Sequence, residues 1–346
     1  MERKTELVSL SIGCKPNSKD PCVWTINRKG TRLTICTHVD DVLTTSKLSE
    51  NTQWIGKQLK KEFGEIKEQA GSDMKYLGMR LQRDKAGNII LSMDKLLAEI
   101  LEGVNSTQTD PANDNLMKSP VDPTLLPEKE KTRFHTLVAK LLYLVLRIRP
   151  DILVGVSFLT TRVTSPTVSD RQKLEHLLRY LYGTRDLQYI INNSPIERVY
   201  GYIDSSHACH SDVIGHYGLV IVVGTTAVHF VSKKMRKVAS DSTAAELIAL
   251  SDRYNNVITA HEFLINLGFH LPPPVILQDN KSTIQMVAPN SKNLQDKYMA
   301  VRQSMVRERI ILNELEVRFT STDTMLADAL TKPLHGKSFS QFRRRR

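Results

Sequence analysis

The chain has 346 residues, enough for roughly two or three domains with hydrophobic cores of their own. With 40% hydrophobic and 25% charged residues, its composition is that of a globular protein and excludes a disordered or fibrous one. The formal net charge of +11 favours a polyanionic partner, nucleic acid before a membrane surface, and the 6% of aromatic residues disfavours a base-stacking platform for single strands.

Cysteine spacing and apolar runs exclude further classes. The four cysteines lie far apart without a CxxC pair, which argues against a disulfide framework or a zinc module and favours a reducing compartment. Residues 1–13 lack the apolar core of a secretory signal. The most apolar stretch, 137–156, is interrupted by charged residues, so no membrane span is expected. We therefore expect a cytoplasmic or nuclear protein.

The first hundred residues are predicted to mix short strands with helices. Apolar alternation around turn residues indicates hairpins, and apolar residues at helical spacing indicate amphipathic helices. The expected elements are a hairpin turning at 27–30, a strand at 41–46 after Asp40 and Asp41, a helix at 52–64, a hairpin within 75–93 turning at 86–88, and a short helix at 93–104.

The middle of the chain changes character twice. Residues 104–131 are polar and rich in proline, which is typical of a linker or a long surface connection. Helical spacing then returns in 133–148, ending before Pro150, and in 169–184, which we expect to begin with Ser169 as its cap and to stop at Gly183.

From about residue 198 the order of elements indicates the fold. Three consecutive strands precede a long helix from Ser242, and strands then alternate with helices up to a last helix at 324–332. This order predicts an α/β (α+β) domain with one mixed sheet packed by helices. The strands are expected at 198–204, 217–223, 227–232, 274–278 and 316–322, and the closing arginines as a basic tail at 341–346.

Four acidic residues occupy particular places in that order. Asp204 ends the first strand, Glu246 lies in the first turns of the long helix, Asp279 follows the fourth strand, and Asp328 lies on the last helix. Strand ends and helix starts converge at one edge of such sheets, where four carboxylates would repel one another unless cations lay between them. Two Mg²⁺ ions would suit these ligands and the cleavage of a phosphodiester. Taken singly, each acid is equally an ordinary turn former or helix cap.

Several stretches of the second half match one known family. They are GYIDSSHACHSD (201–212), KKMRKVASDSTAAELIAL (233–250), LQDNKSTIQM (277–286) and LADALTKPL (326–334). These resemble the ribonuclease H part of copia-type LTR retrotransposon Pol polyproteins. The resemblance implies a ribonuclease H-like mixed five-stranded sheet with flanking helices at 196–340. It also implies that Asp204, Glu246, Asp279 and Asp328 are the catalytic and metal-binding residues, with two Mg²⁺ or Mn²⁺ ions.

The first half resembles other parts of the same polyprotein. HVDDVLTTS (38–46) resembles the Tyr-Val-Asp-Asp turn of reverse transcriptases, which presents the carboxylates corresponding to Asp40 and Asp41 at a hairpin tip; the alternative is an ordinary turn. The resemblance implies a truncated reverse transcriptase palm and thumb part at 1–103, a linker at 104–131 and a helical connection at 132–195. The family's palm needs a third aspartate from a strand upstream of this turn, and none of the 39 residues before Asp40 is expected to supply that strand. We therefore expect that this chain alone does not synthesise DNA.

A basic run lies between the proposed site residues. Lys233, Lys234, Arg236 and Lys237 are predicted to bind the backbone of an RNA–DNA hybrid without reading its sequence, although a charge run is also typical of a plain solvated surface. His207, Cys209 and His210 fit no zinc spacing and are expected in an exposed loop at the mouth of the site.

The sequence thus predicts a retrotransposon-derived Pol fragment whose ribonuclease H domain cleaves RNA in RNA–DNA hybrids. The expected partners are the hybrid and the remainder of a Pol polyprotein, with no membrane and no small-molecule cofactor, and a virus-like particle if the element is active. The family's usual Trp is Phe230 here, and Tyr298 stands where the family usually has His. These departures keep open an alternative, a catalytically dead nucleic-acid-binding relic, and a third, a palm half that acts in trans.

Overall fold

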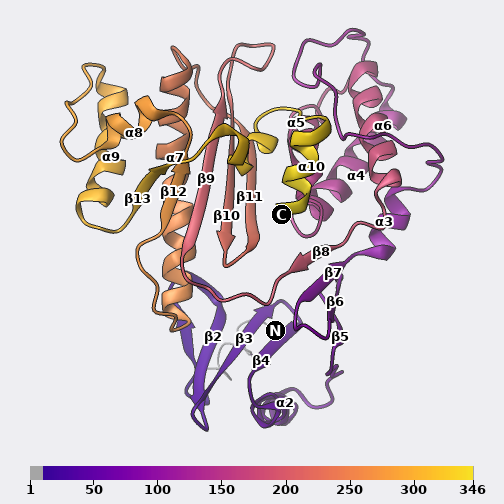
Figure 1. Cartoon of the computed structure of the whole chain (residues 1–346). Coiled ribbons are helices and arrows are strands. Elements are labelled where there is room, and N and C mark those ends of the chain that lie inside the picture. Colours follow the sequence, from indigo (N-terminus) through magenta and orange to yellow (C-terminus); the bar gives the residue numbers. More distant parts are fainter. Residues whose placement is uncertain (1–10, 346) are drawn as a thin grey trace. The chain divides into compact units, whose positions relative to one another are not determined.

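The computed structural model describes residues 11–345, and Figure 1 shows their helices and strands. They form two compact units: the first runs to Ile90 and includes Thr259–Leu271, and the second holds Leu91–Ile258 and the chain from Pro272 onward. The predicted domain boundaries at residues 103, 131, 195 and 340 divide the chain more finely than these two units do, and they stay a prediction. None of the described helices is long and apolar enough to cross a bilayer. The segment expected to lack a secretory signal lies mostly outside the described residues.

The first unit contains an antiparallel four-stranded sheet in the order β1-β2-β3-β4. One side of this sheet is buried by α2, because Leu33 and Ile35 alternate inward on β3 and meet Ile55 and Leu59 of the helix. The predicted first hairpin, the strand after it and the helix are confirmed. Their bounds are Lys15–Asn17 for β1, Asp20–Arg28 for β2, Thr31–His38 for β3, Asp41–Ser46 for β4 and Ser49–Phe63 for α2.

Further short strands follow: β5 (Asp73–Tyr76), β6 (Met79–Arg83) and β7 (Ile89–Ser92). The predicted turn at 86–88 joins β6 to β7, as expected. The turn between β5 and β6 was not predicted, although Gly78 supplies one of its left-handed conformations, with a φ of 72°.

The second unit begins with helices. They are α3 (Asp94–Ile100), α4 (Glu128–Val145), α5 (Leu153–Thr160) and α6 (Val168–Gly183), with the 3-10 turn η1 (Pro150–Ile152) before α5 and strand β8 (Tyr189–Ile191) after α6. The predicted serine cap of α6 is wrong. Thr167 is the cap, since its hydroxyl accepts a bond from the Asp170 amide and the Asp170 carboxylate accepts one from the Thr167 amide, a capping box. Ser169 instead lies inside the helix, where its hydroxyl accepts a bond from the Asp122 amide.

The segment before α4, residues 104–127, contains no helix and only a single bridge, between Leu125 and Thr167. It is nevertheless packed onto the second unit, because five of its side chains are buried: Pro111, Ala112, Leu116, Met117 and Leu126. The stretch predicted as a linker is therefore an irregular but anchored connection.

The mixed five-stranded sheet predicted for the second half is present. Its order is β11-β10-β9-β12-β13, with antiparallel pairing from β11 to β9 and parallel pairing from β9 to β13. The strands are Val199–Ser206 (β9), His216–Val223 (β10), Thr226–Lys234 (β11), Val275–Gln278 (β12) and Glu316–Phe319 (β13).

Helices pack against this sheet, as Figure 1 shows for α7 (Ser242–Asn266) beside β9 and β12. The packing at β9 is tight, because a Cβ on Gly201 would lie 2.4 Å from a methyl group of Val257. The predicted helices α8 (Lys281–Val287) and α9 (Lys297–Ile311) follow β12 and precede β13.

The end of the chain differs from expectation in two ways. The predicted last helix, which carries Asp328, consists of the 3-10 turns η2 (Thr322–Thr324) and η3 (Leu326–Leu330). Apolar side chains of η3 are buried on all sides of the turn, so the segment has no amphipathic α-helical face. The expected basic tail instead continues helix α10 (Gly336–Arg345), in which Phe339 and Phe342 are buried; Arg346 lies outside the described residues.

Candidate carboxylate site and nucleic-acid surface

The four predicted carboxylates all lie in the second unit. Asp204 is on β9, Glu246 is in the first turns of α7, Asp279 directly follows β12, and Asp328 is in η3. They are electrostatic neighbours: Asp328 and Asp279 both raise the pKa of Asp204, and Asp204 and Asp279 raise that of Glu246. The chain thus brings acids from four separate elements to one edge of the mixed sheet.

Asp204 and Glu246 are the buried members of the group, each with a relative exposure of 6%. Burial, reinforced by the neighbouring carboxylates, raises the pKa of Asp204 to about 7, although the Thr331 hydroxyl donates to its Oδ2 at 2.6 Å. Burial and the charge of Asp204 raise the pKa of Glu246 to about 8. These raised pKa values mean that too little positive charge lies nearby to stabilise the two carboxylates in their ionised form.

Gln278, at the end of β12, orients Glu246 and was not predicted from the sequence. Its side-chain oxygen accepts bonds from the amides of Asp279 (2.8 Å) and Asn280 (3.1 Å). Its amide nitrogen therefore faces Glu246 and donates to Oε2 at 3.1 Å, while the Ser205 amide donates to Oε1 at 3.2 Å. The only signal in the sequence is a polar residue at the end of an apolar strand; in the structure this side chain has no exposed surface.

The other two carboxylates are less buried and have partners of their own. The Thr322 hydroxyl donates to Oδ2 of Asp279 at 2.9 Å. Lys332, one turn after Asp328, places its ammonium 2.5 Å from Oδ1 of that residue. Thr331 and Lys332 belong to the motif LADALTKPL (326–334), but their contacts with the acids were not predicted from the sequence.

Carboxylates are suitable ligands for divalent cations, but these four do not form a coordination sphere in the structure. Among residues 11–345, no three His, Cys, Asp or Glu side chains are arranged to hold one ion. Each of the four acids instead accepts from a protein donor: Thr331, Gln278, Thr322 or Lys332. A set of carboxylate oxygens is nevertheless the donor set that Mg²⁺ and Mn²⁺ prefer.

Gly218 allows η3 to approach the site. It lies directly across from Asp204 in the β9–β10 pairing. A Cβ at this position would lie 2.7 Å from the carbonyl oxygen of Ala327 and 2.9 Å from Cβ of Leu330. Any side chain here would push η3, and with it Asp328, away from Asp204.

The expectation of an exposed loop at 207–210 is wrong for His210. This side chain is buried and bonds through Nε2 to Nδ1 of His216 at 3.0 Å. His216 bonds in turn through Nε2 to the Ser232 hydroxyl at 2.8 Å, which donates to the carbonyl of Leu330 at 2.7 Å. Burial lowers the pKa of His210 to about 4 and that of His216 to about 3, so both rings are neutral near pH 7.

The predicted aspartate pair of the first unit lies at a hairpin tip. Asp41 begins β4 and pairs with His38, so Val39, with a φ of 52°, and Asp40 form the turn. Both aspartates are exposed. The local geometry is therefore the one expected for HVDD.

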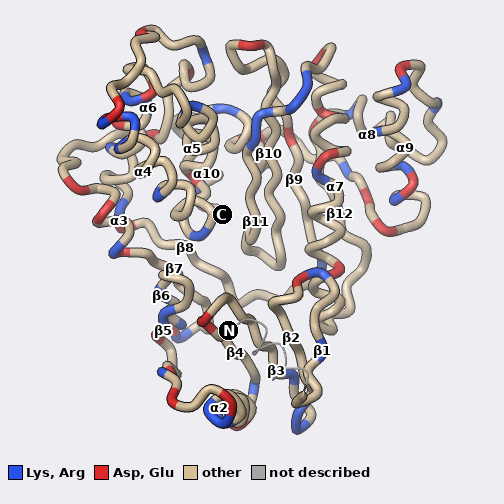
Figure 2. Tube along the Cα trace, turned by 180° about the vertical axis from the view of Figure 1, so that it is seen from behind, with Lys and Arg blue, Asp and Glu red and all other residues tan. Residues whose placement is uncertain are grey.

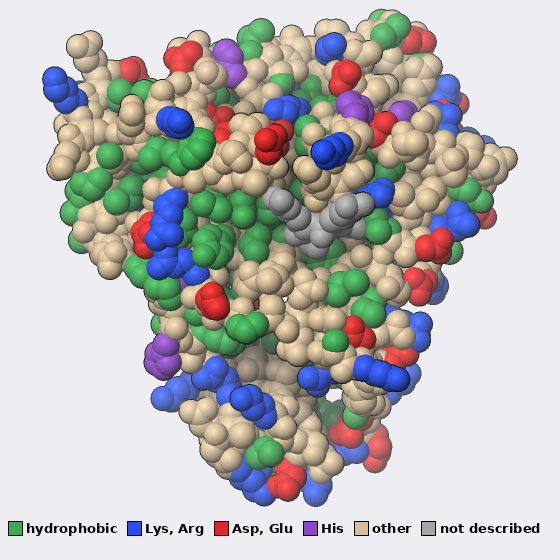
Figure 3. Space-filling view, viewed as in Figure 1, with side chains coloured by type: hydrophobic (Ala, Val, Ile, Leu, Met, Phe, Trp, Pro, Cys, Tyr) green, Lys and Arg blue, Asp and Glu red, His purple; other side chains and the backbone are tan. Residues whose placement is uncertain are grey.

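The basic run begins with Lys233 and Lys234 at the end of β11 and continues into the segment before α7, where Figure 2 shows a blue stretch of the tube. Lys233, Arg236 and Lys237 are exposed, whereas Lys234 forms an ion pair with Asp212 at 2.5 Å. The ammonium of Lys237 lies 4.4 Å from the ring centroid of Tyr298. On the face drawn in Figure 3, cationic side chains are interspersed with acidic ones, so the net charge does not form one uniform field there.

Comparisons with known proteins relate the chain to retroelements. No family model matches it. It is 27% identical over 343 residues to the retrovirus-related Pol polyprotein from transposon RE2 of Arabidopsis thaliana, a match that covers 97% of this chain and 23% of the relative. The Pol polyprotein from transposon TNT 1-94 of Nicotiana tabacum is 27% identical over 92% of this chain, and the Ty1-JR2 Gag-Pol polyprotein of Saccharomyces cerevisiae is 23% identical over 91%.

Solved structures give weaker likenesses. The N-terminal ribonuclease H domain of a Mycobacterium tuberculosis protein matches with a TM-score of 0.30 and 13% identity, covering 40% of this chain and 91% of that one. The foamy viral protease-reverse transcriptase in complex with RNA/DNA hybrid matches with a TM-score of 0.46 and 13% identity, covering 83% of this chain and 36% of that one.

The chain spans about a quarter or less of the length of the curated relatives that it matches, 25% of TNT 1-94 and 19% of Ty1-JR2. All of these relatives are polyproteins of transposons. The resemblance predicted from the sequence is confirmed: over nearly its whole length, this chain is related to part of the Pol polyproteins of copia- and Ty1-type transposons.

Proposed function

We propose that the second unit is a ribonuclease H that cleaves the RNA strand of RNA–DNA hybrids with two Mg²⁺ or Mn²⁺ ions. One observation carries the proposal: Asp204, Glu246, Asp279 and Asp328 are electrostatic neighbours at one edge of the mixed sheet, and the two buried ones have raised pKa values. The relationship to transposon Pol polyproteins supports the same activity.

The residues have distinct roles in this proposal. Asp204, Glu246 and Asp279 hold the cations, and Asp328 completes the second cation site. Bound there, the cations would activate water and stabilise the leaving oxygen of the phosphodiester. Gln278 and the Ser205 amide fix both oxygens of Glu246. Among residues 11–345, Thr331 donates to Oδ2 of Asp204, and no hydrogen bond to Oδ1 is found.

Lys233, Arg236 and Lys237 supply contacts to the hybrid backbone in this proposal. Exposed cations near a cleavage site bind phosphates regardless of sequence, so binding should weaken as salt rises. Lys234 contributes less, because Asp212 already neutralises it.

The hairpin of Asp40 and Asp41 is proposed as a polymerase-type carboxylate pair that does not support DNA synthesis by itself. The family resemblance implies a third aspartate on a further strand, and no motif for it is found in this sequence. Primer extension with Mg²⁺ or Mn²⁺ should give no product, and extension by this chain alone would contradict the proposal.

Cleavage of a labelled RNA–DNA hybrid by the purified chain tests the main proposal. The wild type should cut with Mg²⁺ or Mn²⁺, and Asp279→Asn should abolish cutting while leaving the fold intact. Asp186→Asn, which changes an exposed aspartate outside the site, should cut like the wild type. Equal cutting by Asp279→Asn and the wild type would show that the carboxylate assignment is wrong.

The second candidate is a nucleic-acid-binding relic without catalysis. The net charge of +11 and two departures from the family motif favour it. Phe230 packs edge-on against Tyr189, and the Tyr298 ring lies between Lys237 and Arg302 instead of providing an imidazole. The relic predicts salt-dependent hybrid binding and no cleavage at any Mg²⁺ or Mn²⁺ concentration.

A further inference from the structure

One short segment carries two of the donors that hold the carboxylates. Residues 328–335, which we call the arm, lead from η3 into α10. Within the arm, the Thr331 hydroxyl donates to Asp204 at 2.6 Å and the Lys332 ammonium lies 2.5 Å from Asp328. The arm therefore contains Asp328 and contacts Asp204.

The inner end of the arm is anchored to the sheet. The Ser232 hydroxyl on β11 donates to the Leu330 carbonyl, and His216 and His210 form the buried chain behind it. Because the Leu330 carbonyl can only accept, the Ser232 proton is directed at it, and the Ser232 oxygen accepts from Nε2 of His216.

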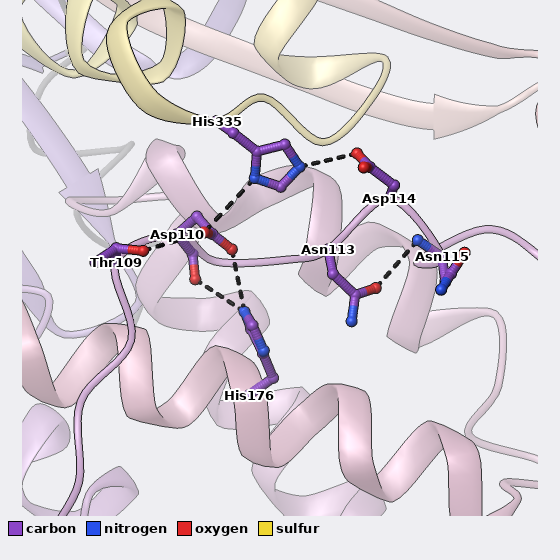
Figure 4. A network of polar contacts seen from close by, with 7 residues as sticks. All are labelled: Thr109, Asp110, Asn113, Asp114, Asn115, His176 and His335. Atoms are coloured by element: carbon purple, nitrogen blue, oxygen red, sulfur yellow. Dashed lines mark hydrogen bonds and ion pairs between the residues drawn. The ribbon is translucent and has the colours of Figure 1, made fainter.

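The outer end of the arm is anchored to the segment before α4 (Figure 4). His335 bonds through Nε2 to Oδ1 of Asp114 at 2.9 Å, and its Nδ1 lies 3.6 Å from Oδ2 of Asp110. Asp110 is itself fixed by His176 of α6, whose Nε2 lies 3.2 Å from Oδ1 and 3.1 Å from the Asp110 carbonyl.

Helix α10 prevents the arm from leaving this position. Phe339 is buried and meets Tyr180 of α6 edge-on, with ring centroids 5.8 Å apart. Tyr180 is in turn fixed by a bond from its hydroxyl to the buried Asp151 at 2.7 Å. The outer anchor thus rests on the helices of residues 132–195 and on the segment predicted as a linker.

We propose that the segment before α4, together with α6, is a positioning element of the carboxylate site. Asp110 and Asp114 of this segment hold His335, with Asp110 fixed in turn by α6. His335 holds the arm, in which Thr331 contacts Asp204 and Lys332 contacts Asp328. His335 and Asp114 are positioning residues that do not touch substrate. The expected effect on cleavage rests on the proposed function. The expected effect on the arm itself does not depend on any activity.

Hydrogen exchange in the full chain tests the structural part without substrate. The amides of Thr331 and Lys332 both bond to the Asp328 carbonyl, so their exchange reports on the arm. His335→Ala should speed exchange in 328–335 by up to about fivefold, the limit set by an exposed ion pair. His335→Gln, which keeps a donor for Asp114, should restore slow exchange. His135→Ala, at an exposed histidine of α4, is the matched control.

Cleavage assays test the catalytic part. His335→Ala and Asp114→Asn should each raise the Mg²⁺ concentration needed for half-maximal cleavage several-fold while leaving KM for the hybrid unchanged. If hydrogen exchange in 328–335 is as slow in His335→Ala and in Asp114→Asn as in the His135→Ala control, the inference is wrong. A wild type that never cleaves would instead overturn the proposed function, and the exchange result would still decide whether the connection holds the arm.

Discussion

Replacing Glu246 by Gln should change how the stability of the metal-free protein depends on pH. In the folded protein the pKa of Asp204 is raised to about 7 and that of Glu246 to about 8, each by burial first and by a neighbouring acid next. In the unfolded chain both groups ionise near pH 4. Between about pH 5 and about pH 8 the folded state therefore binds more protons than the unfolded state, and the free energy of unfolding falls as pH rises.

The size of the effect follows from these values. A pKa raised by about three pH units corresponds to about 4 kcal/mol for one group. The charge of Asp204 contributes to the raised pKa of Glu246, so the two contributions do not add, and solvent and local relaxation reduce them further. We expect the wild type to lose about 2 kcal/mol across this pH range, and Glu246→Gln to lose about half as much because the side chain at 246 then no longer ionises.

Urea denaturation in EDTA at several pH values measures this difference. Glu246→Gln also turns an amide towards the donor nitrogen of Gln278, which costs about 1 kcal/mol at every pH, so the slopes are compared and not the absolute stabilities. Added Mg²⁺ should flatten the slope of the wild type. Parallel slopes for the two proteins would refute the reasoning that the carboxylates lack compensating charge.

Three further substitutions test other parts of the structure. Arg149→Met leaves the buried carboxylate of Asp151 without its cation and should cost about 3–5 kcal/mol of unfolding free energy in urea denaturation. Gly218→Ala places a methyl group against the Ala327 carbonyl and should cost about 1–3 kcal/mol, with a higher Mg²⁺ requirement for cleavage. Lys237→Ala should weaken hybrid binding for all sequences and reduce the salt slope by about 1; an unchanged slope would remove this residue from the interface.

Much of the fold was predictable because its signals are local. The strands of the mixed sheet have apolar runs between turn residues, and the capped helices α8 and α9 follow from Asn280 and Asp296, whose side chains accept bonds from the first turns. Asp204 and Asp279 could be predicted in the same way, as acids at the ends of such runs.

The elements that were missed lack a periodic signal. Helix α5 is apolar on nearly every side because it is buried all round, so no helical face is visible in LVGVSFLT. The capping choice at α6 was ambiguous because Thr167 and Ser169 both carry hydroxyls near the helix start, and only Thr167 has an acid three residues later.

The supporting residues of the site could not be predicted because their partners are distant in sequence. Gln278 reaches Glu246 across 32 residues, and Ser232 reaches Leu330 across 98. In the sequence, Gly218 is one glycine in a strand, and only the packing of η3 against it shows why no side chain fits there. Local patterns identified the acids, whereas tertiary packing determines what holds them.

The long span of the arm contacts has a consequence for folding. The bond from Thr331 to Asp204 joins residues 127 apart, and the bond from His335 to Asp114 joins residues 221 apart. Such contacts form late, because closing long loops must precede any gain from them. During synthesis, the sheet and α7 emerge before the arm does. We therefore expect the nascent chain to bring Asp204, Glu246 and Asp279 together before Thr331 and Lys332 are available, so that docking of the arm is a late folding step.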